Sequence, residues 1–178
     1  MNPTQLPTDG TLPLLVLQII AVSGEFPPAF SGHFPGGSSY IGSVIGKLKK
    51  DGLLRSYTKN GLRGLRLTAS AKRLLLQKYP FDLAPYLTGA SETNSLKSEP
   101  ERRLRLHRMA EALLILHNAQ IPSLPWEKPS MQDWLSKPTL FPVYYSSREF
   151  KSLGSLCTKI RNSRMTGVLF TEQAIFPV

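Results

Sequence analysis

Apolar residues recur at helical spacing in two early segments of the chain. In the first segment, positions i, i+3, i+4 and i+7 are apolar from about Leu12 to Val22, which predicts a helix. The same spacing recurs from Ile41 to Leu48, with Ser38 or Ser39 as an N-cap. Gly52 stands where a left-handed glycine commonly ends a helix. The proline- and glycine-rich stretch between the two segments predicts an irregular connector.

The period then changes from helical to strand-like. Residues 53–58 and 62–68 form two short runs, separated by a turn at Lys59-Asn60-Gly61. Asn-Gly is the strongest short-range hairpin signal. A further helix is predicted from Ser70 to Tyr79, and Pro80 is expected to stop it. Helix, connector, helix, hairpin and helix is the order of a winged helix-turn-helix.

The second half has weaker periodicity. Gly89 to Ser98 is small and polar and marks the best boundary, and a capping box at Ser98 begins a helix that runs to about Asn118. The first half of this helix is rich in arginine, which a phosphate or acidic partner would explain, although a solvated face is the commoner reason. Residues 147–160 are expected to be partly helical. Short strands are expected around Ser123–Trp126, Leu140–Tyr145, Thr166–Thr171 and Ala174–Val178.

These patterns predict an α+β fold with two domains. We assign residues 1–80 to a winged-helix domain, 81–98 to a linker and 99–178 to a smaller α+β domain. The chain ends on Pro177-Val178, inside an apolar run. We therefore expect the second domain to be incomplete at its C-terminus.

Charge is concentrated in one part of the 178-residue chain. The whole sequence has 22 Lys and Arg against 12 Asp and Glu, a net charge of +10. Ten of the basic residues and only one acid, Asp51, lie between Lys47 and Lys78, and no Lys or Arg precedes Lys47. This segment therefore carries +9, which favours an anionic partner for the second helix and the hairpin.

Double-stranded DNA is the partner that this arrangement fits best. The second helix would enter the major groove and the hairpin would act as a wing against the backbone. An acidic protein docking on the same surface remains an alternative. The predicted phosphate contacts are Lys47, Lys50, Arg55, Lys59, Arg63 and Arg66, and the predicted base contacts are Ser39, Tyr40 and Ser43.

Other features of the composition limit the function. The single cysteine and three scattered histidines offer no cysteine-cluster zinc site, and we expect no cofactor. The apolar run from Leu12 to Val22 is too short for a membrane span and lacks a basic region before it. We therefore expect a cytoplasmic protein without a membrane partner. The C-terminal domain is expected to bind either a second copy of the chain or another protein.

A metal-dependent nuclease is an alternative function. Glu149-Phe150-Lys151 is an E-x-K triplet, and Asp133 precedes it by sixteen residues. This order resembles PD-(D/E)xK nucleases, in which two carboxylates hold a divalent metal and a lysine stabilises the attacking water. Asp133 can equally be an acid at a helix start, and Glu149 and Lys151 can be members of surface ion pairs.

Short segments spread along the chain carry a family resemblance. They lie at 38–40, 48–53, 61–68, 87–89, 97–99, 102–107, 127–129, 145–151 and 163–169. The first three resemble the winged-helix part of replication-relaxation-like proteins, which occur on plasmids and integrative conjugative elements of Gram-positive gut bacteria. The later segments are similar to this family too, so the resemblance covers most of the chain. It implies DNA binding in the replication, transfer or control of a mobile element, and it supplies no catalytic residue.

Overall fold

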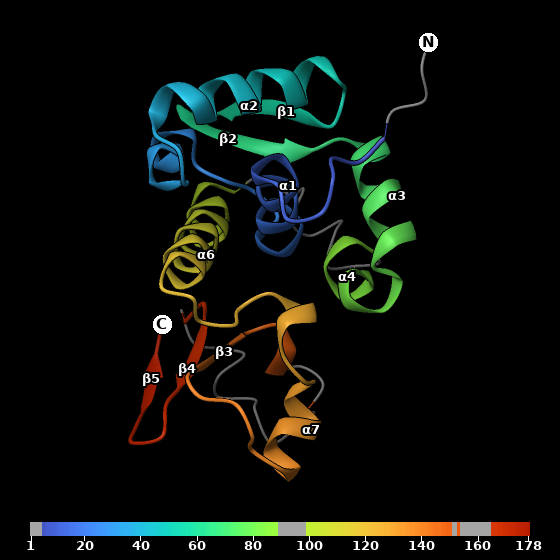
Figure 1. The fold of residues 1–178 in the computed structure, drawn as a ribbon. Helices are drawn as coiled ribbons and strands as arrows, with labels where there is room; N and C mark the ends of the chain where they lie inside the picture. Colours follow the sequence, from blue (N-terminus) through green and yellow to red (C-terminus); the bar gives the residue numbers. More distant parts are fainter. Residues whose placement is uncertain (1–4, 89–98, 151–152, 154–164) are drawn as a thin grey trace. The chain divides into compact units, whose positions relative to one another are not determined.

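The computed structural model describes residues 5–88, 99–150, 153 and 165–178 (Figure 1). The fold is α+β, with two small antiparallel sheets among these residues. The chain divides into two compact units, Met1–Leu114 and Ile115–Val178. In chain order the elements are α1 (Leu12–Ser23), η1 (Pro28–His33), α2 (Ser38–Lys50), β1 (Leu54–Lys59), β2 (Leu62–Leu67), α3 (Ala69–Lys78), α4 (Pro80–Leu87), α6 (Pro100–Asn118), η2 (Pro125–Glu127), α7 (Met131–Ser136), β3 (Val143–Ser146), β4 (Gly167–Phe170) and β5 (Ile175–Pro177).

Helix α1 forms the centre of the first unit. Its apolar residues are buried nearly all round, from Leu14 to Val22, so the predicted helix is confirmed. The chain then passes through Phe26, which exchanges two backbone hydrogen bonds with Leu65 of β2 at 2.8 and 3.0 Å. Helix α2 packs along β1, while α1 packs against β2 (Figure 1). The chain order is therefore helix, single bridge, short helix, helix and hairpin.

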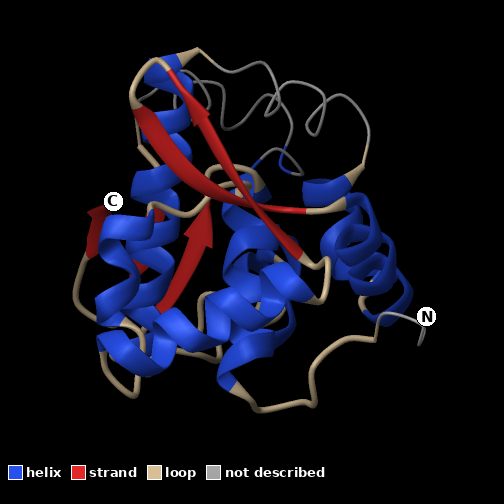
Figure 2. Cartoon of the chain, turned by 90° about the horizontal axis from the view of Figure 1, so that it is seen from above, coloured by secondary structure: helices blue, strands red, loops and turns tan. Residues whose placement is uncertain are grey.

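The hairpin turns at the predicted Asn60-Gly61 pair, although Lys59, which was also assigned to the turn, is the last residue of β1. Asn60 and Gly61 have positive φ values of 50° and 74°, and Lys59 pairs with Leu62. Both central residues are left-handed, as a type I′ turn requires. Figure 2 shows the twist of the two strands. Gly52 has φ 70° after the end of α2, as expected, but the N-cap of α2 is Gly37 and not Ser38 or Ser39.

The first unit extends beyond the predicted boundary at residue 80. Helix α3 matches its prediction, but Pro80 begins α4 instead of ending the structured domain. A proline is tolerated in the first turn of a helix because its missing N–H has no partner there. Leu83 and Leu87 are buried, and α4 packs against α1 and α3. Residues 80–87 are thus helical and part of the first unit; residues 89–98 of the predicted linker lie outside the described residues.

The second unit contains the sheet β3–β4–β5 and α7. Strands β4 and β5 fall within the predicted strands Thr166–Thr171 and Ala174–Val178, whereas β3 overlaps the predicted strand Leu140–Tyr145 and extends one residue past it. The three strands pair antiparallel. The prediction of a strand at Ser123–Trp126 is wrong, because Pro125–Glu127 is a 3₁₀ turn in which the Glu127 carboxylate accepts the N–H groups of Ser123 and Leu124. The core is formed by Met131, Trp134, Val143, Tyr145, Phe150 and Val168. Most of residues 147–160 lies outside the described part.

Candidate nucleic-acid interface

Helix α2 has one buried face and one exposed face. Ile41, Val44 and Leu48 are buried at helical spacing. The five predicted DNA-contacting residues of this helix are all exposed: Ser39, Tyr40, Ser43, Lys47 and Lys50. The sequence therefore correctly separates the packing face from the solvent face, because both follow from the same period of 3.6 residues.

Two glycines precede α2 and bring its aromatic residue close to the backbone. Gly36 and Gly37 have positive φ values of 95° and 82°. A Cβ at Gly36 would lie 2.6 Å from Cδ1 of Tyr40, so the Tyr40 ring packs directly against this turn. Tyr40 as a whole is nevertheless 53% exposed. It thus presents an aromatic side chain at the start of the exposed face.

The hairpin adds exposed cations next to α2. Arg55 and Lys59 on β1 and Arg63 on β2 are exposed. Among the described residues, Lys47, Lys50 and Arg63 form no ion pair. These side chains keep their charge facing solvent, where it is available to an anionic partner.

Arg66 does not belong to this surface. It is only 3% exposed, and its guanidinium lies 3.9 Å from the centre of the Tyr57 ring. Its Nε donates a 2.5 Å hydrogen bond to Oε2 of Glu25. The prediction that Arg66 contacts phosphate is corrected for this reason: both faces of this end of β2 are covered, one by the apolar core and one by Glu25.

Glu25 is the centre of a buried charge cluster, which we define as Glu25, Arg66, Arg103 and His107. The Glu25 carboxylate is fully buried. Arg103 of α6 donates from Nη2 to Oε1 at 2.6 Å and from Nε to both oxygens at 3.0 and 3.2 Å. Nε2 of His107, one turn along α6, lies 2.8 Å from Oε1. Residues far apart in the sequence, on β2 and α6, therefore share one carboxylate.

This environment keeps Glu25 ionised. Burial raises the pKa of the carboxyl, but the hydrogen bonds from His107, Arg103 and Arg66 outweigh burial and lower the pKa from 4.5 to about 2. Gly64 leaves the space that the carboxylate needs, since a Cβ at Gly64 would lie 1.9 Å from Oε1 of Glu25. The cluster thus depends on a residue without a side chain in the middle of β2.

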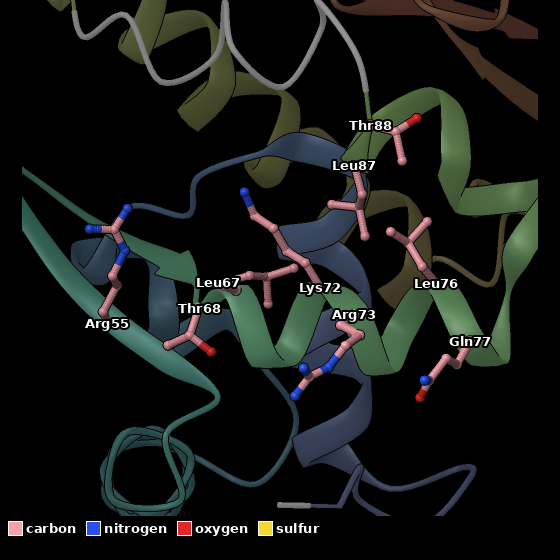
Figure 3. A pocket seen from close by; sticks show the side chains of 10 residues that line it. Arg55, Leu67, Thr68, Lys72, Arg73, Leu76, Gln77, Leu87 and Thr88 are labelled. Carbon is pink, nitrogen blue, oxygen red and sulfur yellow. The ribbon is translucent and has the colours of Figure 1, made fainter.

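A shallow pocket of about 870 Å³ lies beside the base of the hairpin (Figure 3). Leu67, Leu76 and Leu87 provide its apolar part, while Arg55, Lys72 and Arg73 bring three cations to it. The remaining lining residues are Thr68, Ala69, Gln77 and Thr88, so no acidic side chain from the described residues lines it. The pocket extends the positive region from Arg55 towards α3.

The structure uses the predicted nuclease residues differently. Oδ2 of Asp133 accepts a hydrogen bond from Ser130, and its N–H donates to Ser130 Oγ at 3.2 Å, which makes it the helix-start acid of α7. Glu149 accepts the N–H of Ser146 at 2.7 Å and lies 3.1 Å from Nζ of Lys128. Lys151 lies outside the described residues.

Lys128 is a buried cation for which the sequence predicted no role. Its side chain is 1% exposed, and Nζ donates to the carbonyls of Ser123 and Tyr144 as well as to Glu149. Burial lowers the pKa of Lys128, and the neighbouring Glu149 carboxylate opposes this effect. Lys128 and Glu149 therefore act as a structural pair that joins the loop before α7 to β3.

The described residues contain no group of three His, Cys, Asp or Glu side chains arranged to hold a metal ion. None of the described helices has the length and apolar character needed to cross a bilayer. His107, one of the three histidines, is buried against Glu25, and Cys157, the single cysteine, lies outside the described residues.

Comparison of the chain with protein-family models, curated proteins and solved structures finds no match. The resemblance to replication-relaxation-like proteins therefore stays a prediction.

Proposed function

We propose that the chain binds duplex DNA through the exposed face of α2 and the β1–β2 hairpin. The observation that carries this proposal is the set of exposed cations on these adjoining elements: Lys47, Lys49, Lys50, Arg55, Lys59 and Arg63. The positive charge of lysine and arginine on a helix and a neighbouring hairpin is complementary to the negative charge of the two phosphate backbones of duplex DNA.

The positions and partners of the acidic residues support this proposal. Between residues 5 and 88, Asp9 is paired with Lys78, Glu25 is buried against two arginines, and Asp82 lies in the first turn of α4. The fourth acid of this range is Asp51. Neither Asp9 nor Glu25 neutralises the α2 face. Asp51, at the C-cap of α2, is the one acid in the sequence between Lys47 and Lys78. A surface this poor in acids attracts a polyanion over a long range at low salt.

The order of elements supports a winged-helix interpretation of the first unit. Helix α1, the Phe26–Leu65 bridge, η1, α2 and the hairpin follow one another as the helices, the short first strand and the wing do in that architecture. In this arrangement α2 enters the major groove, with Ser39, Tyr40 and Ser43 towards base edges. The resemblance noted in the sequence extends the proposal to replication, transfer or control of a mobile element.

The test is fluorescence anisotropy with a labelled duplex of random sequence over a salt series. Six phosphate contacts predict that log K falls with log salt with a slope of about −5. The double substitution Lys47→Ala/Arg63→Ala should reduce the steepness by about 2, because each lost phosphate contact removes about 0.9.

The matched control removes the same charge elsewhere. Lys78→Ala/Lys137→Ala replaces two exposed cations outside α2 and the hairpin, and we expect it to leave the slope nearly unchanged. If both double variants flatten the slope equally, net charge and not this surface governs binding. If the wild-type chain does not bind duplex DNA at low salt, the proposed function is wrong.

A further inference from the structure

Helix α6 carries a second row of exposed cations. Arg102, Arg105 and Arg108 are all exposed and follow one another at three-residue spacing. They span about 9 Å along the helix axis, at a rise of about 1.5 Å per residue. None of the three forms an ion pair within the part of the chain that the structure describes.

The start of this row is unfavourable for an isolated helix. Arg102 lies in the first turn of α6, where the helix dipole favours acids and disfavours cations, and Arg105 and Arg108 follow in the next turns. Glu101 is the acidic residue of the first turn. An anion that binds these side chains offsets this unfavourable interaction with the dipole, because its negative charge stabilises the arginines.

The other side of α6 is fixed to the hairpin. Besides binding Glu25, Arg103 donates from Nη1 to the Lys59 carbonyl at 3.1 Å and from Nη2 to the Tyr57 carbonyl at 3.4 Å. Its guanidinium also lies 4.8 Å from the centre of the Tyr57 ring. The start of α6 is therefore held against the distal half of β1, next to the turn of the hairpin (Figure 1).

This attachment brings the backbone at the start of the α6 row close to the tip of the hairpin. Lys59 ends β1, and Arg63 pairs across the hairpin with Thr58. The carbonyl that accepts from Arg103 belongs to Lys59 itself. Arg102 is the residue before Arg103, so the α6 row begins beside the exposed cations at the hairpin tip.

We propose that Arg102, Arg105 and Arg108 form a second phosphate-contacting element, which extends the duplex DNA interface from the hairpin onto α6. This inference rests on the proposed function. The buried charge cluster supplies its rigidity, since α6 is held in place before DNA arrives and only the arginine side chains lose freedom on binding. Arginine suits this role because its planar guanidinium binds phosphate oxygens in pairs.

The test compares salt slopes of DNA binding for the full chain and for Arg102→Gln/Arg105→Gln. Loss of two phosphate contacts should reduce the steepness of the slope by about 2. Lys78→Gln/Lys137→Gln removes the same charge and should not do so. Thermal unfolding, followed by circular dichroism, checks that the α6 variant folds as the wild type does. If it does not fold, the salt slopes of Arg105→Lys, which keeps the charge, and Arg108→Gln, which removes one charge, are compared in its place.

The outcomes separate this inference from the function on which it rests. A slope reduced by the α6 substitutions and not by the control supports the second element. If Lys47→Ala/Arg63→Ala flattens the slope and the α6 variant does not, the DNA-binding proposal stands and the α6 inference is overturned, which leaves the arginines to a partner of another class. If the wild-type chain does not bind DNA, both fail.

Discussion

Replacing Glu25 with glutamine should strongly destabilise the first unit. The substitution keeps the shape of the side chain and one acceptor oxygen but removes the charge that Arg66 and Arg103 share. The pKa of Glu25 falls from 4.5 to about 2. A difference of about 2.5 in pKa corresponds to about 3 kcal/mol, at about 1.36 kcal/mol for each pKa unit. Removing one partner from a buried ion pair costs about 3–5 kcal/mol in other proteins, which agrees with this value.

Urea denaturation at neutral pH, followed by circular dichroism, measures this loss as a fall in the free energy of unfolding. The control is Asp9→Asn, which breaks the pair between Asp9 and Lys78, whose side chains are 70% and 31% exposed. We expect the control to cost less than about 1 kcal/mol because water screens an exposed pair. A loss below about 1 kcal/mol for Glu25→Gln, equal to the control, would refute the reasoning about the buried charge cluster.

Three further predictions follow from the same contacts. The wild-type free energy of unfolding should fall as pH is lowered from about 4.5 to about 2. The stabilisation by ionised Glu25 is fully present above the pKa of the unfolded chain and is lost as Glu25 of the folded chain is protonated. In Glu25→Gln, urea denaturation over the same pH range should show no such part of the pH dependence. Gly64→Ala should cost about 1–3 kcal/mol in urea denaturation because its Cβ would overlap the Glu25 carboxylate, whereas Gly46→Ala, with open space around it on α2, should stabilise by up to about 1 kcal/mol. Lys128→Met should destabilise the second unit by at least about 2 kcal/mol, measured as loss of the near-ultraviolet signal of its core aromatics, because Glu149 loses its partner; an unchanged midpoint would contradict the structural role of this pair.

The first unit shows how much of a fold local sequence can specify. The helical spacing of α1 and α2, the left-handed Gly52 and the Asn60-Gly61 turn each depend on residues close together in the chain. Local preference and final structure agree at these positions, so the helices and the hairpin were predictable. The exposed face of α2 followed from the same period.

The buried charge cluster was not predictable in this way. Arg66 lies 41 residues from Glu25, and Arg103 lies 78 residues from it. Strand alternation places Arg63 and Arg66, three positions apart in β2, on opposite faces, but it does not tell which of the two is buried. Only tertiary packing shows that one arginine of the hairpin is buried while the other faces solvent. Glu25 was the available signal, as the one acid between Asp9 and Asp51 in a long apolar stretch.

Helix α4 shows a second limit of local rules. Pro80 was interpreted as a stop signal, which it is for α3, but it is also compatible with the first turn of a new helix. Whether a proline ends the structured domain or begins another helix depends on what the next residues contact. Here Leu83 and Leu87 are buried, so the residues after Pro80 form a further helix of the first unit.

The location of bound DNA is the most direct test of the central proposal. Amide chemical shifts of the ¹⁵N-labelled chain are measured during titration with a duplex of random sequence. Binding through α2 and the hairpin predicts that the largest changes fall at Ser39–Lys50 and around Asn60, with smaller changes in the second unit. Changes concentrated on β3–β5 or α7, or no changes at low salt, would contradict the proposed interface.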